Sequence, residues 1–411
     1  MTETTLLDVA YVRERFPALD DIALFENAGG TRVPYTVIER LRRYMTENQV
    51  QPGAAYASSA LGAERIRESH RLMAEMINAT PEEVMVGIST TMNVYLLAHA
   101  LRPGLHAGDE IVVTNMDHEA NNGAWRRLAE HGVVVREWAI DPDRAELDPE
   151  ALEPLLNERT RLVCFTHCSN ITGSIHDVAA ITRRVHQAGA LVCVDAVAYA
   201  PHRLLDVKAL DVDFYLCSLY KIYGPHLSLL YGKREHLLAA RGQNHFFIGE
   251  DEIPLKLNPG GPNHELSAAL GGIIDYFDAL HAHHFPGSNA PLHQRLGACF
   301  TLIAEHEERI AEAFVDFLRS KPGVRIIGRP TADRHRRVPT FSFVAHGQDS
   351  EAIARHCAAH KVGIGAGHFY AKRLVDALGL DAPHGVIRAS MVHYNSAAEV
   401  ERLIRYLDEV L

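Results

Sequence analysis

The sequence predicts an α/β protein with a mostly parallel seven-stranded sheet, followed by a smaller α+β domain. Two observations predict the sheet. From about residue 84, short apolar runs alternate with amphipathic helical patterns, which is typical of successive βαβ units. The apolar runs are also nearly continuous rather than alternating, as expected of strands that are buried on both faces.

Seven apolar runs make up the predicted sheet: 82–87, 109–115, 133–140, 161–167, 190–197, 213–219 and 227–232. Between them lie helix-like patterns, which include 119–131, 148–158 and 177–188. Parallel sheets of this kind bind their ligands in the loops that follow the carboxyl ends of the strands. Those loops are therefore where we expect the chemistry.

The pattern changes after a long helical stretch that begins near Pro291 and ends near Leu318. Beyond it, shorter strand-like and helical patterns alternate; they are 324–328, 340–345, 350–360, 362–367, 386–391 and 397–410. We predict a large domain over 21–290 and a small C-terminal domain over 291–411. Residues 1–20 are expected to return and pack on the small domain.

Composition excludes several classes of function. The chain has 411 residues, of which 47% are hydrophobic, so two domains can each bury a core. The net charge of −11 and the lack of a long basic run argue against a nucleic-acid partner. Two short basic clusters are interpreted as solvated faces; they are Arg40, Arg42 and Arg43, then Arg334, Arg336 and Arg337. The N-terminus has no signal-peptide pattern, and no run reaches the roughly 18 apolar residues of a membrane span, so we expect a cytoplasmic protein without membrane contact.

Cysteine and histidine usage does not indicate a metal site. The six cysteines include no CxxC pair, which also argues against a disulfide framework. The densest histidine group, HAHHF at 281–285, has only Asp278 close by as a carboxylate, so we interpret it as a polar loop.

A lysine and an aspartate follow two predicted strands. Lys221 lies just past 213–219, ahead of an aromatic residue and Gly-Pro, and Asp195 ends the apolar part of 190–197. A nucleophilic lysine needs a lowered pKa, which burial supplies. A buried carboxylate needs a cation, and a protonated pyridine nitrogen is one. Either residue alone is better explained as an ordinary surface or strand-end residue, but the two together favour a cofactor site.

These segments resemble those of the class V aminotransferase group of fold-type I pyridoxal 5′-phosphate (PLP) enzymes. The most similar branch is that of the cysteine desulfurase and selenocysteine lyase-like proteins. The resemblance covers nearly the whole chain, from FENAGGT at 25–31 to IRASMVHYN at 387–395. It implies the fold-type I architecture, with PLP held as a Schiff base on Lys221 in SLYKIYGPH and paired through its pyridine nitrogen with Asp195 in VDAVAYAPH.

The resemblance also assigns roles to residues around the cofactor. His118 in NMDHEANNGAW would stack on the PLP ring, and Asn170 in THCSNITG would contact its phenolic oxygen. Thr90 and Thr91 in ISTTMNVY would bind the phosphate at a helix start. The full set of implied cofactor contacts is Thr90, Thr91, His118, Asn170, Asp195, His202, Ser218 and Lys221; Lys221, His118 and Asp195 are the implied catalytic residues.

Three residues are implied to contact the substrate. Arg388 lies where the family has an arginine that grips the substrate carboxylate, and Asn27 and Tyr370 belong to segments that match the same pocket. Taken singly, these segments have simpler explanations. His118 could be a loop histidine, Thr90 a helix cap and Arg388 a structural ion pair. The ordered set of segments is what favours the functional interpretation.

The sequence departs from the desulfurases at the cysteine that carries persulfide sulfur. The matching stretch is IGAGHFYAKRL at 364–374, in which Tyr370 takes the place of the cysteine, while Cys357 falls in a predicted helix. Tyr220 also stands where the desulfurases often have histidine, and Ala198 where they commonly have glutamine. A persulfide mechanism is therefore not expected.

Three functions remain open from the sequence. We favour a C–S or C–Se lyase that acts on a small, cysteine-like amino acid through an external aldimine and deprotonation at Cα by Lys221. An aminotransferase or amino-acid epimerase is the second possibility. A PLP-fold binding protein without activity is the third, against which stands the retention of Lys221, Asp195, His118 and Asn170 together.

The resemblance further implies a homodimer with its active site at the subunit boundary. NPGGPNHE at 258–265 resembles a turn that reaches the PLP phosphate of the partner, so the Gly261 region is expected to lie near the partner's site. Pro262 follows Gly261 where the family commonly has threonine, so Asn263 would have to supply the contact. An ordinary surface turn explains the segment equally well.

Overall fold

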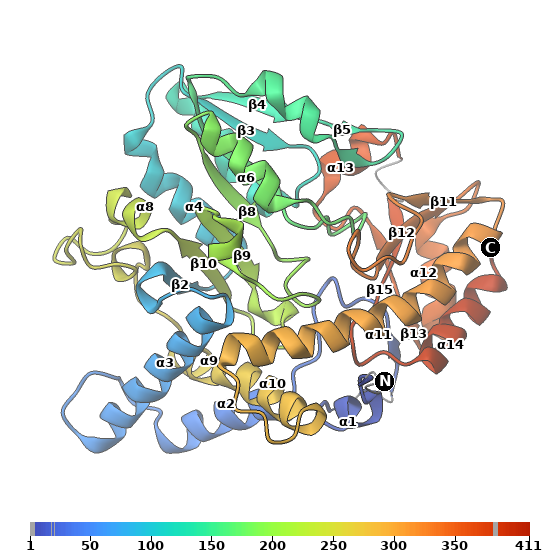
Figure 1. Cartoon of the computed structure of the whole chain (residues 1–411), viewed down its shortest axis with the longest axis horizontal. Helices are drawn as coiled ribbons and strands as arrows, with labels where there is room; N and C mark the ends of the chain where they lie inside the picture. Colours follow the sequence, from blue (N-terminus) through green and yellow to red (C-terminus); the bar gives the residue numbers. More distant parts are fainter. Residues whose placement is uncertain (1–4, 18, 20, 381–384) are drawn as a thin grey trace.

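The computed structural model describes residues 5–17, 19, 21–380 and 385–411. They form a seven-stranded sheet and a four-stranded sheet, which lie apart in Figure 1. Helix α11 (Leu292–Ser320) runs between them. It packs against helices α3 (Ala57–Met76) and α10 (Gly271–His284) of the larger part and against strand β11 of the smaller sheet.

The large sheet confirms the predicted α/β architecture. Its strands follow the order β2-β10-β9-β8-β7-β3-β4, and β10 alone among these seven is antiparallel to its neighbours. Every predicted apolar run contains one strand; in chain order these are β2 (Val84–Gly87), β3 (Glu110–Thr114), β4 (Val134–Trp138), β7 (Thr160–Thr166), β8 (Leu191–Asp195), β9 (Phe214–Ser218) and β10 (Ser228–Gly232). Strands β3, β9 and β10 are buried throughout, which explains their continuous apolar sequence.

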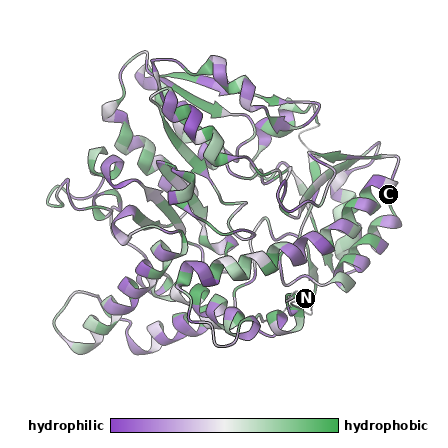
Figure 2. Ribbon diagram, in the orientation of Figure 1, coloured by the Kyte–Doolittle hydropathy of each residue, from purple (hydrophilic) through white to green (hydrophobic). Residues whose placement is uncertain are grey.

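Apolar residues on the two faces of this sheet belong to separate core clusters. Val163 and Val194 point to one face, and Cys164 and Cys193 to the other. Figure 2 shows the strands almost uniformly hydrophobic, whereas the helices that cover them carry hydrophilic residues on their outer sides. None of the described helices combines the length and the apolarity that crossing a membrane requires.

The helical predictions succeed in part. The pattern at 177–188 is confirmed as α6 (Val178–Gln187). The pattern at 119–131 is broken into η3 (Glu119–Asn121), α5 (Gly123–Arg126) and η4 (Arg127–His131), because Asn122 leaves the helical region of φ and ψ. The pattern at 148–158 is a 3₁₀ segment, η5 (Pro149–Leu155), where Pro154 cannot donate the hydrogen bond of a continuing α-helix.

The smaller sheet has the order β11-β12-β15-β14 and is antiparallel throughout. Its strands are β11 (Val324–Ile327), β12 (Thr340–Ala345), β14 (Gly365–Gly367) and β15 (Val386–Ser390), and α12 (Ser350–Ala359) and α14 (Ala397–Asp408) pack beside it. The run 362–367, predicted as one strand, is divided. Its first part, β13 (Val362–Gly363), pairs instead with β1 (Ala23–Leu24).

The N-terminal segment contacts elements of both regions of the chain. After α1 (Val9–Arg13), Phe16 packs edge-on against Tyr276 of α10 and against Tyr394. Arg13 forms an ion pair of 3.0 Å with Glu399 of α14. The segment thereby ties the last helix of the chain to the helices beneath the large sheet.

We predict that Gly272→Ala destabilises the protein by about 1–3 kcal/mol, because an alanine methyl would force two helices apart. A Cβ at Gly272 of α10 would lie 2.5 Å from Cα of Val37 in α2 (Tyr35–Glu47). Urea unfolding measures the effect. The control is Gly297→Ala in α11, where a Cβ would meet only Leu204 at 3.5 Å, and where alanine should be neutral or slightly stabilising. Equal stability of the two variants would contradict the prediction.

Candidate active site

A pocket of about 490 Å³, a volume that includes open solvent at its entrance, lies at the carboxyl ends of β7, β8 and β9. The start of α4 (Thr90–Leu101) and the segment after β3 complete its wall. Seven of the eight residues expected to contact a cofactor line it: Thr90, Thr91, His118, Asn170, Asp195, Ser218 and Lys221. The structure thus gathers residues that are up to 131 positions apart in the sequence (90 to 221).

Lys221 is buried at the base of this pocket, with 6% of its surface exposed. It ends a 3₁₀ turn, η6 (Leu219–Lys221), that follows directly on β9. Burial lowers the pKa of Lys221 to about 8, and the charge of Arg388 acts in the same direction. The charges of Asp195 and Glu26 oppose the shift. A substantial share of neutral amine, the nucleophilic form, is therefore present near pH 8.

Asp195 is the last residue of β8 and is 4% exposed. Its Oδ1 accepts a hydrogen bond of 2.8 Å from the backbone N–H of Val197. Burial raises the pKa of Asp195 to about 6, although this hydrogen bond and the charge of Lys221 lower it. A carboxylate in this state is strongly stabilised by any cation that enters the pocket.

His118 presents a neutral ring to the pocket. Its Nδ1 accepts a hydrogen bond of 3.0 Å from the N–H of Ala120, so the proton of the neutral ring resides on Nε2. Burial is the main reason that the pKa of His118 falls to about 3, and the charges of Lys221 and Arg388 add to it. A neutral aromatic face suits stacking on a heteroaromatic ring.

The neighbouring Asp117, which was not singled out from the sequence, is also buried. Its Oδ1 accepts a hydrogen bond of 2.9 Å from Asn121, and it is also hydrogen-bonded to Thr114. Burial, together with the charge of Asp195, raises the pKa of Asp117 to about 8. Asp117 therefore holds a proton at neutral pH, which leaves Asp195 as the charged partner of the two. The neighbours of Asp117 in TNMDHEANN are mostly polar, so the sequence carries no signal of its burial.

Hydroxyl groups and a helix start form one end of the pocket. The Oγ of Ser89 caps α4 by accepting from the N–H of Met92 at 3.1 Å. The Oγ1 of Thr90 lies 2.8 Å from the Oγ of Ser218 and 2.7 Å from that of Ser228. The first N–H groups of a helix are unpaired and carry partial positive charge, so this end of the pocket favours an anion such as phosphate.

Arg388 approaches the pocket from the smaller sheet. It lies on β15 and is 2% exposed, with its guanidinium 3.7 Å above the ring of Phe369. Its Nη1 donates to the carbonyl oxygen of Asn170 at 3.1 Å, and its Nη2 pairs with Oε1 of Glu26 at 2.5 Å. Glu26 was not singled out from the sequence, although it lies in the FENAGGT segment beside Asn27.

Four predicted site residues are not part of the pocket lining: Arg388, Tyr370, His202 and Asn27. His202 is buried, but its Nδ1 lies 2.9 Å from Oε1 of Glu307 on α11. Asn27 donates to the carbonyl oxygens of Leu24 and Ser390, each at 2.9 Å, and so fastens the N-terminal segment to β15. The side chains of His202 and Asn27 are both engaged with the protein itself, and neither is free to contact a ligand in this structure.

The loop that follows β14 packs against the pocket residues Asn170 and His118. Phe369 and Tyr370 both have left-handed backbone conformations, with φ of 46° and 60°, which L-residues adopt at a cost. Asn170 donates to the carbonyl oxygen of Phe369 at 2.9 Å, and the N–H of Glu119 donates to that of Tyr370 at 2.8 Å. The Tyr370 side chain is 69% exposed, and its ring centre lies 5.3 Å from that of His118.

The residues around the pocket fit the cofactor that the resemblance implies. Lys221 offers a covalent anchor, Asp195 a partner for a pyridinium nitrogen, His118 an aromatic face, and the start of α4 a phosphate site. Asn170 also lines the pocket, but its Nδ2 is hydrogen-bonded to Phe369.

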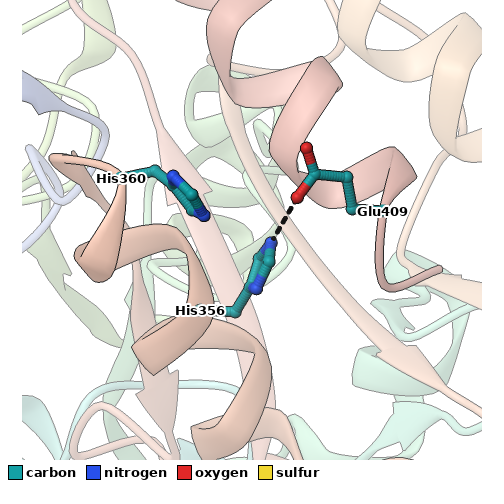
Figure 3. Close-up of side chains that lie close together, drawn as sticks. All are labelled: His356, His360 and Glu409. Atoms are coloured by element: carbon teal, nitrogen blue, oxygen red, sulfur yellow. Dashed lines mark ion pairs between the residues drawn. The ribbon is translucent and has the colours of Figure 1, made fainter.

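A second cluster of potential ligands lies away from the pocket, where α12 and α14 meet (Figure 3). His356, His360 and Glu409 offer ligand atoms within 4.8 Å of one another. His356 pairs with Glu409 at 3.1 Å, and the ring of His360 stacks on Tyr406 at 4.0 Å. These contacts join the last helix of the chain to α12, so packing of the two helices accounts for the cluster.

Comparison with known proteins finds relatives over nearly the whole chain. The family model "Aminotransferase class-V" matches residues 23–299 and 297–403. The "Aminotransferase-like protein FGM3" of Gibberella zeae is 40% identical over 410 residues, which are 97% of this chain and 98% of that protein. The "Cysteine desulfurase-like protein ustD" of Aspergillus flavus is 34% identical over 99% of this chain and 91% of its own. The crystal structure of the cysteine desulfurase CsdA from Escherichia coli matches with a TM-score of 0.82 at 25% identity, over 98% of both chains.

We predict that Lys221 of the cofactor-free protein captures added PLP with a rate that rises through about pH 8. Only the neutral amine attacks an aldehyde, and burial brings the pKa of Lys221 from 10.5 to about 8. Absorbance of the covalent product gives the rate at each pH. In Asp195→Asn the midpoint should move to lower pH, because the charge of Asp195 raises the pKa of Lys221. A wild-type midpoint near 10 would contradict the assignment.

Proposed function

The chain belongs to the aminotransferase class-V family of PLP-dependent, cysteine desulfurase-like enzymes, and we propose that it cleaves the C–S or C–Se bond of a small amino acid without a protein persulfide. The observation that carries the proposal is the burial of Lys221 and Asp195 in one pocket together with His118 and the start of α4. When bound, PLP supplies an electron sink that stabilises negative charge at Cα of the amino acid. The remaining chemistry falls to residues of this chain.

Lys221 is proposed to act in two ways. Its amine anchors the cofactor covalently, and once the amino group of the substrate has replaced it, the same Nζ removes the proton from Cα. A pKa of about 8 suits a base that must be neutral at one stage and protonated at the next. Asp195 and Arg388 both affect its pKa through their charges, which supports a role for Lys221 beside the groups that would hold cofactor and substrate.

Asp195 and His118 are proposed to hold the cofactor ring from its edge and its face. A carboxylate at Asp195 keeps a pyridine nitrogen protonated, and the proton on Asp117 prevents a second negative charge next to it. The neutral ring of His118 covers the face without adding positive charge. Arg388 would bind the substrate carboxylate, which fixes the orientation of the bonds at Cα.

We propose that no persulfide forms on the protein, because of where its cysteines lie. All six are buried in the described structure, and a tyrosine, Tyr370, lies next to His118 where the family has its cysteine. Burial raises the pKa of Cys357, the cysteine nearest in sequence to that loop, to about 11, so its thiol carries no charge at neutral pH. Sulfur would then leave with the substrate fragment or as sulfide rather than on the protein.

Two other functions stay as alternatives. Transamination or epimerisation needs the same Cα deprotonation, and an aminotransferase-like name is carried by the relative from Gibberella zeae. The third alternative is a binding protein without activity. The lowered pKa of Lys221 argues against it, because a protein without chemistry gains nothing from burying an amine whose charge it must suppress.

We also propose a homodimer. In support, Gly260 and Gly261 form a turn with φ of 79° and 77°, and a Cβ at either position would meet no other atom of the chain. The turn is thus open to a second subunit. Asn263 is occupied in capping α9 (His264–Ala269), since its Oδ1 accepts from the N–H of Leu266 at 2.9 Å.

We predict that the purified protein has a visible absorption band, which Lys221→Ala lacks, and that cysteine, cystine or selenocysteine changes this band. Analysis of the products separates the reactions that remain open. Pyruvate would indicate elimination, in which sulfur or selenium leaves as sulfide or selenide. Alanine would indicate desulfuration or deselenation, in which the zero-valent element passes to an acceptor such as a thiol in solution. An oxo acid that accumulates while the cofactor turns into its amine form would show an aminotransferase and contradict the lyase proposal. A protein that takes up no PLP would support the binding-protein alternative.

We predict that thiol alkylation leaves the native protein active. Iodoacetamide reacts with thiolates, and burial both shields the cysteines and raises the pKa of thiols such as Cys357. Mass spectrometry should find no more than trace modification of the folded protein, and six modified cysteines after unfolding in urea, which is the control. Loss of activity upon modification of a single cysteine in the folded protein would show that a thiol takes part.

A further inference from the structure

Glu26 forms an ion pair with the guanidinium of Arg388, the group that the proposed function assigns to binding the substrate carboxylate. Its Oε1 lies 2.5 Å from Nη2 of Arg388, an ion pair that joins the N-terminal segment to β15. Both residues influence the pKa of Lys221 through their charges, so the pair lies within the electrostatic reach of the reactive amine. A substrate carboxylate and the Glu26 carboxylate therefore compete for one cation.

The two partners differ in their freedom to move. The side chain of Arg388 is 2% exposed and is fixed by the ring of Phe369 and by its hydrogen bond to the carbonyl of Asn170. The side chain of Glu26 is 34% exposed. A carboxylate with access to water can leave the ion pair and be hydrated, whereas the guanidinium cannot follow it. Exchange at this site would therefore move Glu26 and leave Arg388 in place.

Two glycines make room for Glu26 in its paired position. A Cβ at Gly29 would lie 2.0 Å from Oε2 of Glu26, and a Cβ at Gly365 would lie 3.3 Å from its Cγ. Gly29 does not need glycine for its backbone, because its φ is not positive. The conformation that reaches Arg388 thus depends on the missing side chain at Gly29. An alanine at Gly29 would therefore displace Glu26 from Arg388 without changing the charge of the protein.

We propose that Glu26 is a displaceable counter-ion that neutralises Arg388 in the resting protein and gives way to the carboxylate of the substrate; this rests on the proposed function only in taking Arg388 as the carboxylate site. A buried guanidinium without a partner is strongly destabilising, so a resident carboxylate stabilises the empty pocket. Binding is then an exchange of carboxylates. Ligands that carry a carboxylate enter, and neutral amides or amines do not displace Glu26.

The test uses propionate, a carboxylate without an amino group, so that binding requires no reaction with the cofactor. Its dissociation constant is measured by calorimetry for the cofactor-loaded wild type, Glu26→Gln and Gly29→Ala. Both variants should bind propionate on the order of tenfold more tightly, because each removes one charge-assisted competitor for Arg388. Propionamide, the neutral analogue, should bind no better to either variant than to the wild type.

The matched control is Glu68→Gln, which removes a glutamate from an ion pair of 3.3 Å with Arg40 on helices outside the pocket. It should leave the propionate affinity unchanged. Unchanged or weaker binding in Glu26→Gln and Gly29→Ala would overturn the proposal, as would a wild type and variants that all fail to bind propionate. Absence of lyase activity would refute the proposed function but not this inference, since propionate binding is measured without turnover.

Discussion

The site depends on one constraint, which is that several charged groups lie in or next to one pocket with little access to water. An amine, a guanidinium and two carboxyl groups meet there, and burial is the largest influence on the pKa of each of Lys221, Asp195, Asp117 and Arg388. Each group is kept in a useful state by burial and by the others. Burial keeps Asp117 protonated and makes Lys221 lose its proton more readily, and the charges of Asp195 and Arg388 add to these two effects.

The topology of the large sheet is what makes such crowding possible. Strands β7, β8 and β9 are adjacent and parallel, so their carboxyl ends deliver Asn170, Asp195 and Lys221 to one edge without any long connection. The smaller sheet contributes Arg388 from β15, and the strand pairing of β1 with β13 brings Glu26 beside it. The ion pair between Arg388 and Glu26 therefore depends on the smaller sheet and on the pairing of β1 with β13.

Much of this was predictable from the sequence, because burial leaves a strong signal in strands. The seven apolar runs gave the seven strands of the large sheet, and a lysine and an aspartate at strand ends pointed to the pocket. His202 and Asn27 could not be judged in the same way. Whether a polar side chain faces a ligand or the protein depends on partners such as Glu307 and Ser390, which are distant in sequence. Glu26 was missed for the same reason, since its partner is 362 residues away.

The loop that follows β14 affects which reaction is possible as much as the charges do. A cysteine that collects sulfur from a substrate and passes it on must move between two positions. Here the corresponding loop is fixed by hydrogen bonds to Asn170 and Glu119, and it holds Phe369 and Tyr370 in left-handed conformations that cost about 1–3 kcal/mol each. Such strain persists only where the surroundings determine the conformation. Phe369 in turn supports the guanidinium of Arg388, so movement of the loop would disturb the carboxylate site. A fixed loop that ends in an exposed tyrosine suits chemistry completed on the cofactor and does not suit sulfur transfer by a mobile thiol.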